Sequence, residues 1–185
     1  MKVIGVVGLN GSGKDEMVKY LNQKYSVPLI SVGDIVRELA AEQGGESTRD
    51  NLDALSATCF KKYGEGYFVK QVVAKIRRNR WPAAGISGIR SPVDIEIVRQ
   101  AFGRNFVLIN VYVSDSRVRY QRVHNRGSRR DQITFEDFLR QDEESENLFR
   151  IRESAGLADY SIDNDGTLEQ MHSEIEKLVK KGLLD

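Results

Sequence analysis

The chain has 185 residues, of which 40% are hydrophobic and 30% charged, a composition typical of one folded domain. Its formal net charge of +1 excludes a general attraction to nucleic acid or to a membrane surface, so phosphate binding must depend on a local patch. A single cysteine, Cys59, excludes a disulfide within the chain and favours a reducing compartment, and we therefore expect a cytoplasmic protein.

Short apolar runs alternate with amphipathic segments along the chain. The first run, at residues 3–7, is rich in β-branched residues and breaks at Gly8, which predicts a buried strand too short to span a membrane. Similar runs predict strands at residues 27–31, 83–89, 106–113 and 160–163. Helical spacing predicts helices at residues 14–25, 34–41, 51–63, 67–80, 93–102, 133–158 and 167–180, and one that Ser114 caps and that runs to about Asn125.

Strands that alternate with helices predict a three-layer α/β fold, with a five-stranded parallel sheet covered by helices on both faces. Ligands of such folds bind beyond the carboxyl ends of the strands. We therefore expect the segments that follow the strands to line one edge of the sheet. These segments are residues 8–14, Asp34, residues 87–90, 114–115 and 164–166.

The loop after the first predicted strand matches the pattern GxxxxGK. Its glycines allow backbone N–H groups to surround phosphate oxygens, and the positive end of the following helix points at the same anion. The lysine of this pattern reaches the β- and γ-phosphates of a nucleotide. The strand before it and the helix after it support a P-loop rather than an ordinary glycine-rich turn. The nucleotide-binding residues of the loop are then Gly8, Asn10, Gly11, Ser12, Gly13 and Lys14.

Asp15 stands where this pattern usually has Ser or Thr, whose hydroxyl contacts Mg²⁺. A carboxylate is a hard oxygen ligand and can bind the metal or one of its waters. The alternative is an acid favoured at a helix N-terminus by the helix dipole. We predict that Asp15 takes part in metal binding.

Residues 31–37 read Ser-Val-Gly-Asp-Ile-Val-Arg and follow the second predicted strand. This segment resembles the adenylate-kinase superfamily, in which a strand ends in a Ser-x-Gly-Asp turn and the next helix carries an arginine. The resemblance implies that Arg37 holds the phosphate of the acceptor, whereas an unrelated helix would simply expose it. Asp34 could cap the helix, position Mg²⁺ or accept a proton from an acceptor hydroxyl.

The segment Ser87-Gly88-Ile89-Arg90 follows the third predicted strand and looks like the family's Asp-Gly-Ile-Arg segment. The resemblance implies that Arg90 is a second arginine for the acceptor phosphate, a contact that suits its planar fork. Ser87 replaces the acid that helps to hold the magnesium shell in relatives. Asp15 is expected to approach the same ion and to compensate.

Six arginines fall within residues 117–130. In adenylate-kinase relatives an arginine-bearing lid lies at this point of the chain, and closing arginines stabilise the transferred phosphoryl group. The alternative is a solvated basic face that pairs with the acidic run 142–146. We assign Arg122 and Arg126, which share one helix face, to catalysis with Lys14 and Asp34. Arg129 and Arg130 are assigned to the lid.

Residues 158–166 resemble the end of dephospho-coenzyme A kinases, where a turn after the last strand packs against the base of the donor. Asn164 and Gly166 match that turn, which is also suited to a plain connection. The pieces together span nearly the whole chain and look like the archaeal adenylate-kinase-related or dephospho-coenzyme A kinase-like group. The resemblance implies one P-loop kinase domain over residues 1–185, an acceptor-binding helical insert at about 34–80 and a lid at about 122–145.

Three functions fit these features. The leading one is a nucleoside monophosphate kinase that uses ATP and Mg²⁺ and a nucleotide-like acceptor. The second is a dephospho-coenzyme A kinase, in which Asp34 assists a ribose hydroxyl. The third is an ATP-driven assembly or RNA-binding factor, although no alternation of aromatic and basic residues favours nucleic acid as a partner. We expect no membrane association.

Overall fold

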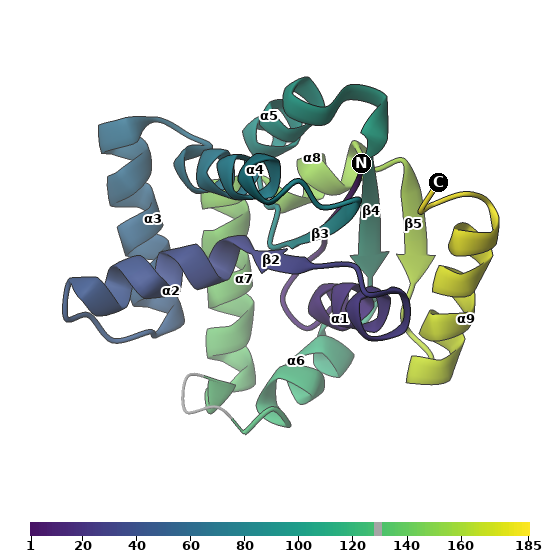
Figure 1. The fold of residues 1–185 in the computed structure, drawn as a ribbon. Helices are drawn as coiled ribbons and strands as arrows, with labels where there is room; N and C mark the ends of the chain where they lie inside the picture. Colours follow the sequence, from purple (N-terminus) through teal and green to yellow (C-terminus); the bar gives the residue numbers. More distant parts are fainter. Residues whose placement is uncertain (128–130) are drawn as a thin grey trace.

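The computed structural model describes residues 1–127 and 131–185, and its centre is a five-stranded sheet in the order β2-β3-β1-β4-β5 (Figure 1). Every neighbouring pair of strands is parallel. The α/β fold with a parallel sheet that the sequence predicts is therefore confirmed. The strands are β1 (Lys2–Val7), β2 (Leu29–Ser31), β3 (Ala83–Ser87), β4 (Phe106–Tyr112) and β5 (Tyr160–Asp163).

β1 is buried on both faces because its side chains alternate between two hydrophobic clusters. Val3 and Val7 pack in one cluster, with residues of α2–α5, α7 and α8. Ile4 and Val6 pack in the other, with residues of α1 and α9. A strand that is apolar at nearly every position is stable only between two layers of helices, and this strand places the loop that follows it at the centre of the molecule.

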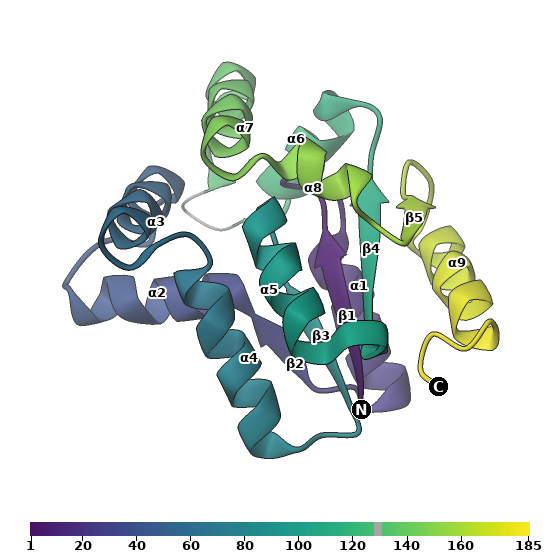
Figure 2. The ribbon, with the colours of Figure 1, turned by 90° about the horizontal axis from the view of Figure 1, so that it is seen from above.

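The helices form the two outer layers, with α1 and α9 on one side of the sheet and α4, α5 and α8 on the other (Figures 1 and 2). Helices α2 and α3 extend beyond the β2 edge, and α7 lies beside them. The helices are α1 (Lys14–Tyr25), α2 (Val32–Glu42), α3 (Arg49–Tyr63), α4 (Tyr67–Asn79), α5 (Pro92–Phe102), α6 (Ser116–His124), α7 (Phe135–Phe149), α8 (Ile151–Gly156) and α9 (Leu168–Lys180), with a 3₁₀ turn at Gly103–Asn105.

Two of the predicted helices differ from the structure. The expected helix at 133–158 is divided into α7 and α8 at Arg150, which adopts a left-handed conformation with φ of 56°. Asp115, not Ser114, caps α6, since its side chain accepts from the N–H of Arg117 at 2.7 Å. Ser114 instead donates to Asp165 at 2.7 Å, and this bond joins the loops after β4 and β5.

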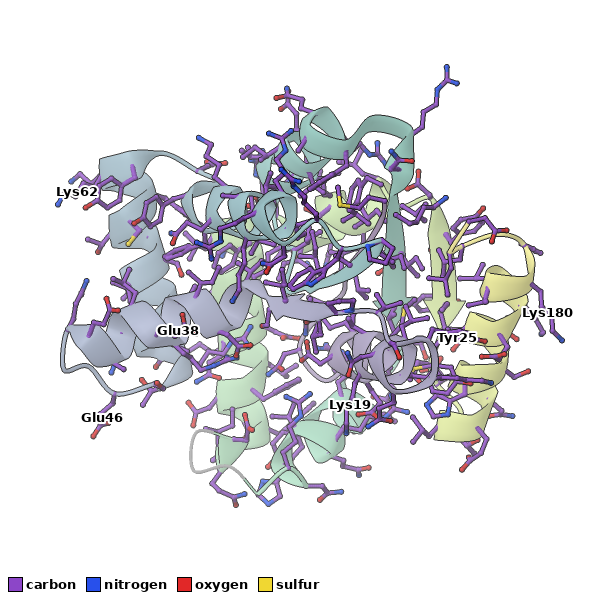
Figure 3. The ribbon with its side chains drawn as sticks, viewed as in Figure 1. Lys19, Tyr25, Glu38, Glu46, Lys62 and Lys180 are labelled. Atoms are coloured by element: carbon purple, nitrogen blue, oxygen red, sulfur yellow. The ribbon has the colours of Figure 1, made fainter. Side chains whose placement is uncertain are left out.

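Glu176 of α9 fastens α9 to α1 through a cluster of polar contacts. The side chain of Tyr25, at the end of α1, points toward α9 (Figure 3) and donates to the carboxylate of Glu176 at 2.8 Å. Tyr20 donates to the same carboxylate at 2.8 Å. Lys24 lies 3.1 Å from the same carboxylate. Hydrogen bonds from Tyr25 and Tyr20, helped by Lys24, lower the pKa of Glu176 to about 2.

We expect the Glu176→Gln variant to unfold about 3 °C below the unchanged protein at pH 7. The folded pKa of Glu176 lies below its ordinary value of 4.5, so the charged carboxylate stabilises the fold above that pH. This contribution is lost as the pH falls from 4.5 toward 2, and the difference in Tm should shrink there. Thermal unfolding followed by circular dichroism measures it. Glu174→Gln, which removes only a contact with Lys177, is the control, and a difference that does not change with pH contradicts the assignment.

Candidate functional site

The glycine-rich loop joins β1 to α1 and wraps around the N-terminus of α1. Gly11 has φ of +79° and Gly13 has φ of +96°, conformations that side chains other than glycine rarely adopt. A Cβ atom at Gly11 would lie 2.5 Å from the carbonyl oxygen of Arg119, and one at Gly13 would meet the side-chain amide of Asn164. The loop therefore requires glycine for both its shape and its packing.

Two side chains from other parts of the chain hold this loop from outside. Asn164, which is only 7% exposed, donates to the carbonyl of Ser12 at 2.8 Å. Arg119, 6% exposed, donates to the carbonyl of Asn10 at 3.0 Å and pairs with Asp142 at 2.5 Å. These bonds occupy carbonyl groups and so hold the loop without using its N–H groups, of which that of Ser12 donates to the carbonyl of Leu9 at 3.2 Å.

Lys14 and Asp15 begin α1 directly after the loop. Desolvation lowers the pKa of Lys14 to about 8; Asp15 opposes this shift, and Arg90 adds to it. Desolvation of Asp15 favours its neutral form, but Lys14 and a hydrogen bond from Ser87 outweigh it, so the pKa of Asp15 is lowered. The Ser87 hydroxyl, at the end of β3, donates to Oδ1 of Asp15. The structure thus brings together the two positions at which the sequence departs from the motifs that it resembles.

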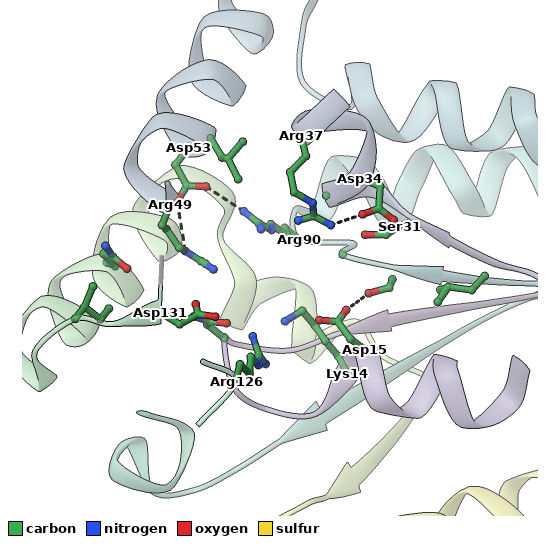
Figure 4. Close-up of a pocket in the computed structure, with 18 residues that line it drawn as sticks. Lys14, Asp15, Ser31, Asp34, Arg37, Arg49, Asp53, Arg90, Arg126 and Asp131 are labelled. Carbon is green, nitrogen blue, oxygen red and sulfur yellow. Dashed lines mark hydrogen bonds and ion pairs between the residues drawn. The ribbon is translucent and has the colours of Figure 1, made fainter. Parts of the chain in front are cut away.

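Lys14, Asp15, Asp34, Arg37 and Arg90 border one cavity of about 280 Å³ at the carboxyl ends of the strands (Figure 4). The sequence-predicted groups for the γ-phosphate and for the acceptor therefore face one space.

Each of the two predicted acceptor arginines has a carboxylate partner in this cavity. Arg37 pairs with Asp34, three residues earlier on α2. Arg90 pairs with Asp53 of α3 at 3.1 Å and lies over the ring of Phe149, 4.7 Å from its centroid. A phosphate group that enters the cavity can replace the carboxylates as partner of both arginines.

Several residues of the cavity were not predicted from the sequence. Arg49, at the start of α3, donates to Ser145 at 3.1 Å and lies 3.8 Å from Asp53. Ser145 in turn donates to Asp53 at 2.8 Å, which links α3 to α7. Arg49 stands twelve residues after Arg37 and belongs to no recognisable motif. The sequence signal that could have indicated it is its place just before a predicted helix, with the acidic residue Asp53 four positions later.

A narrower pocket of about 40 Å³ opens between α2, α3 and α7 and shares Arg37, Asp53 and Arg90 with the main cavity. Its walls are aromatic and apolar, and its polar groups include Ser56 and Asp94. The apolar residues that line it are Val32, Val36, Leu52, Phe60, Phe68 and Phe149. The arrangement places a phosphate-sized cationic site beside an aromatic one.

A separate cavity on the α9 side of the loop is bordered by Gly13, Arg122, Arg126 and Asn164. Arg122 donates to the carbonyl of Gly166 at 3.2 Å, and its Nη1 atom is buried without a hydrogen-bond partner among the described residues. Arg122 therefore lies at the turn after β5 and does not border the main cavity, whereas Arg126 borders both cavities.

The remaining arginines of the basic run have other surroundings. Arg119 pairs with Asp142 of the acidic run and so joins α6 to α7, but it is buried and does not belong to a solvated face. Arg117 lies over the ring of Phe135, 4.8 Å from its centroid. Arg129 and Arg130 lie outside the described residues. In the part of the chain that the structure describes, no three His, Cys, Asp or Glu side chains gather as a metal site, and no helix has the length and apolarity to cross a bilayer.

A family profile described as an AAA domain matches residues 7–138 of this chain. A UPF0200 protein of Pyrococcus horikoshii is 34% identical to it over 181 residues, which cover 97% of this chain and 96% of that protein.

Two solved structures are similar in fold. A gluconokinase from Sinorhizobium meliloti has a TM-score of 0.54 and 14% identity, with 98% of this chain and 97% of that chain covered. A shikimate kinase from Bacteroides thetaiotaomicron has a TM-score of 0.56 and 16% identity, with 97% of each chain covered. These similarities establish the fold of P-loop kinases.

Proposed function

The chain belongs to the UPF0200 family and has the fold of P-loop kinases, and from this we propose that it transfers the γ-phosphoryl group of ATP to a nucleoside monophosphate. The observation that supports this acceptor is that Lys14, Arg37 and Arg90 border one cavity. In the reaction, an oxygen of the acceptor phosphate attacks the γ-phosphorus. The bond from that phosphorus to the β–γ bridging oxygen breaks, which yields ADP and a nucleoside diphosphate.

The residues of the site divide between donor and acceptor. The loop N–H groups and Lys14 bind the β- and γ-phosphates, and the arginine pair Arg37 and Arg90 holds the acceptor phosphate in line with them. Arg126, at the border of both cavities, stabilises charge on the transferred group. Mg²⁺, when bound with ATP, neutralises charge on the β- and γ-oxygens.

The donor base fits the cavity beside α9. Arg122 and Asn164 border this cavity, and Arg122 also donates to the carbonyl of Gly166 in the turn after β5. In this assignment Arg122 binds the donor instead of taking part in catalysis. We also assign residues about 34–80 to the acceptor-binding insert and residues about 122–145 to the lid, of which 128–130 lie outside the described residues.

The aromatic pocket supports a nucleotide over a sugar-like acceptor. Phe60, Phe68 and Phe149 give this pocket an aromatic lining next to the two arginines, and such a lining suits a base better than a sugar. A polyhydroxylated acceptor needs hydrogen-bonding walls, and the polar side chains of this pocket are Ser56, the two arginines, Asp53 and Asp94.

A panel of acceptors tests the proposal. The purified protein is incubated with ATP, Mg²⁺ and, separately, AMP, CMP, GMP, UMP, their deoxy forms, dephospho-coenzyme A, gluconate and shikimate. We expect ADP and a nucleoside diphosphate with at least one monophosphate, measured by chromatography. Transfer to gluconate or shikimate alone, or to no acceptor, contradicts the proposal.

The Arg37→Ala variant should raise the KM for the acceptor about 10- to 100-fold, because a charge-assisted contact with the phosphate is lost. The affinity for ATP should change little, since Arg37 borders the acceptor side. Steady-state kinetics and ATP titration measure the two effects. Arg104→Ala, in the exposed 3₁₀ turn, is the matched control. Equal loss of acceptor and ATP binding argues against the assignment.

Asp34 gives a specific reason to consider dephospho-coenzyme A kinase as a second function. Its exposed carboxylate borders the main cavity beside Arg37, where it could accept the proton of an attacking hydroxyl. A phosphate acceptor is already ionised and needs no such base.

The Asp34→Asn variant separates the two functions. For a nucleoside monophosphate acceptor we expect kcat to change by less than about tenfold. For a ribose hydroxyl acceptor the loss should be about 100-fold or more, the size of a general-base contribution. Kinetics with both acceptor types measure it, and Glu38→Gln on the exposed side of α2 controls for the removal of one negative charge from this helix.

A further inference from the structure

In P-loop proteins, a hydroxyl directly after the lysine contacts Mg²⁺, and a carboxylate at the end of a neighbouring strand completes the surroundings of the metal. In this chain the carboxylate, Asp15, follows the lysine and the hydroxyl, Ser87, ends the strand β3. We propose that the two residues have exchanged roles as well as positions: Asp15 is the magnesium ligand, and Ser87 is the positioning residue that orients its carboxylate. The inference rests on the proposed function for its use of ATP with Mg²⁺.

The contact between the two side chains supports the exchange. The Ser87 hydroxyl donates to Oδ1 of Asp15, although 72 residues separate them in the chain. Ser87 is 2% exposed and is held at the end of a central strand, whereas Asp15 is exposed where it borders the main cavity next to Lys14 (Figure 4). A buried hydroxyl on a rigid strand fixes one carboxylate oxygen of a residue that faces the ligand space.

Three other carboxylates border the cavity, namely Asp34, Asp53 and the buried Asp131. Asp34 pairs with Arg37 and Asp53 pairs with Arg90, so both are engaged on the acceptor side. Asp15 is instead the carboxylate next to the P-loop lysine, where the β- and γ-phosphates bind. Magnesium keeps several waters and is usually bound by one or two carboxylates plus phosphate oxygens, so a single protein carboxylate is sufficient.

The exchange preserves the chemical composition of the site. One hydroxyl and one carboxylate remain, with the same total charge, but the anionic group is now carried by α1 and not by β3. This explains why the absence of the acid at position 87 does not leave the site without a metal ligand.

A reciprocal substitution tests the exchange. The affinity for the non-hydrolysable analogue AMP-PNP is measured by calorimetry, in Mg²⁺ and in EDTA, for the unchanged protein, Asp15→Ser, Ser87→Asp and the double variant. We expect Mg²⁺ to strengthen binding at least about tenfold in the unchanged protein and to have little effect in Asp15→Ser. Ser87→Asp should bind the analogue more weakly in EDTA, because two adjacent carboxylates repel the phosphates. The double variant should recover most of the Mg²⁺ effect.

Further variants make the result decisive. Glu169→Ser, which removes a first-turn acid from α9, should keep the full Mg²⁺ effect. Asp15→Asn keeps the side-chain shape and should also lose the Mg²⁺ effect. It takes the place of Asp15→Ser if that variant unfolds. A full Mg²⁺ effect in Asp15→Ser or Asp15→Asn, or a double variant no better than the single ones, overturns the exchange. Because binding is measured without an acceptor, a failed acceptor panel leaves this result intact, whereas absence of nucleotide binding overturns both proposals.

Discussion

The structure depends on one constraint: the backbone between β1 and α1 must hold a tight loop in which Gly11 and Gly13 adopt left-handed conformations. Such a loop cannot make the usual bonds of a strand or helix, so its carbonyl groups need partners from elsewhere. Asn164, beyond the last strand, and Arg119, on α6, supply two of them. The segments after β4 and β5 are thereby tied to the loop after β1, and the candidate donor and acceptor sites are built around it.

The charge of the candidate acceptor site is balanced before any ligand binds. Arg37 and Arg90 are cations needed for a phosphate, but each is paired with an aspartate in the structure. Isolated arginines side by side would repel one another and destabilise the fold. The aspartates remove this cost, and an incoming dianionic phosphate must compete with them. Unphosphorylated nucleosides lack the charge to do so.

Features that depend on local sequence could be predicted. The β-branched run before Gly8 and the GxxxxGK pattern locate β1, the loop and α1, because strand propensity, glycine conformation and helix dipole act over a few residues. The resemblance to kinases identified Arg37 and Arg90 as neighbours of Lys14 in one cavity. Their roles in phosphate transfer remain predictions.

Features that depend on tertiary packing could not be predicted from the sequence. Arg49 and Asp53 enter the cavity only because α3 packs beside α7, and no short-range pattern encodes that contact. At the break between α7 and α8, Arg150 adopts a left-handed conformation that residues other than glycine rarely adopt, so the local sequence does not indicate it. The hydrogen bond between Ser87 and Asp15 was not predicted either, although the two positions were expected near one ion.

Arg126 lies on the border of the two cavities, and its exposed guanidinium has room to turn toward either. A ligand in one cavity that draws this side chain inward reduces the cost of ordering it for the ligand in the other. The two ligands then strengthen each other's binding by the same factor, as thermodynamic linkage demands. In the proposed reaction, a single arginine at this border would make the affinity for each substrate depend on whether the other is bound.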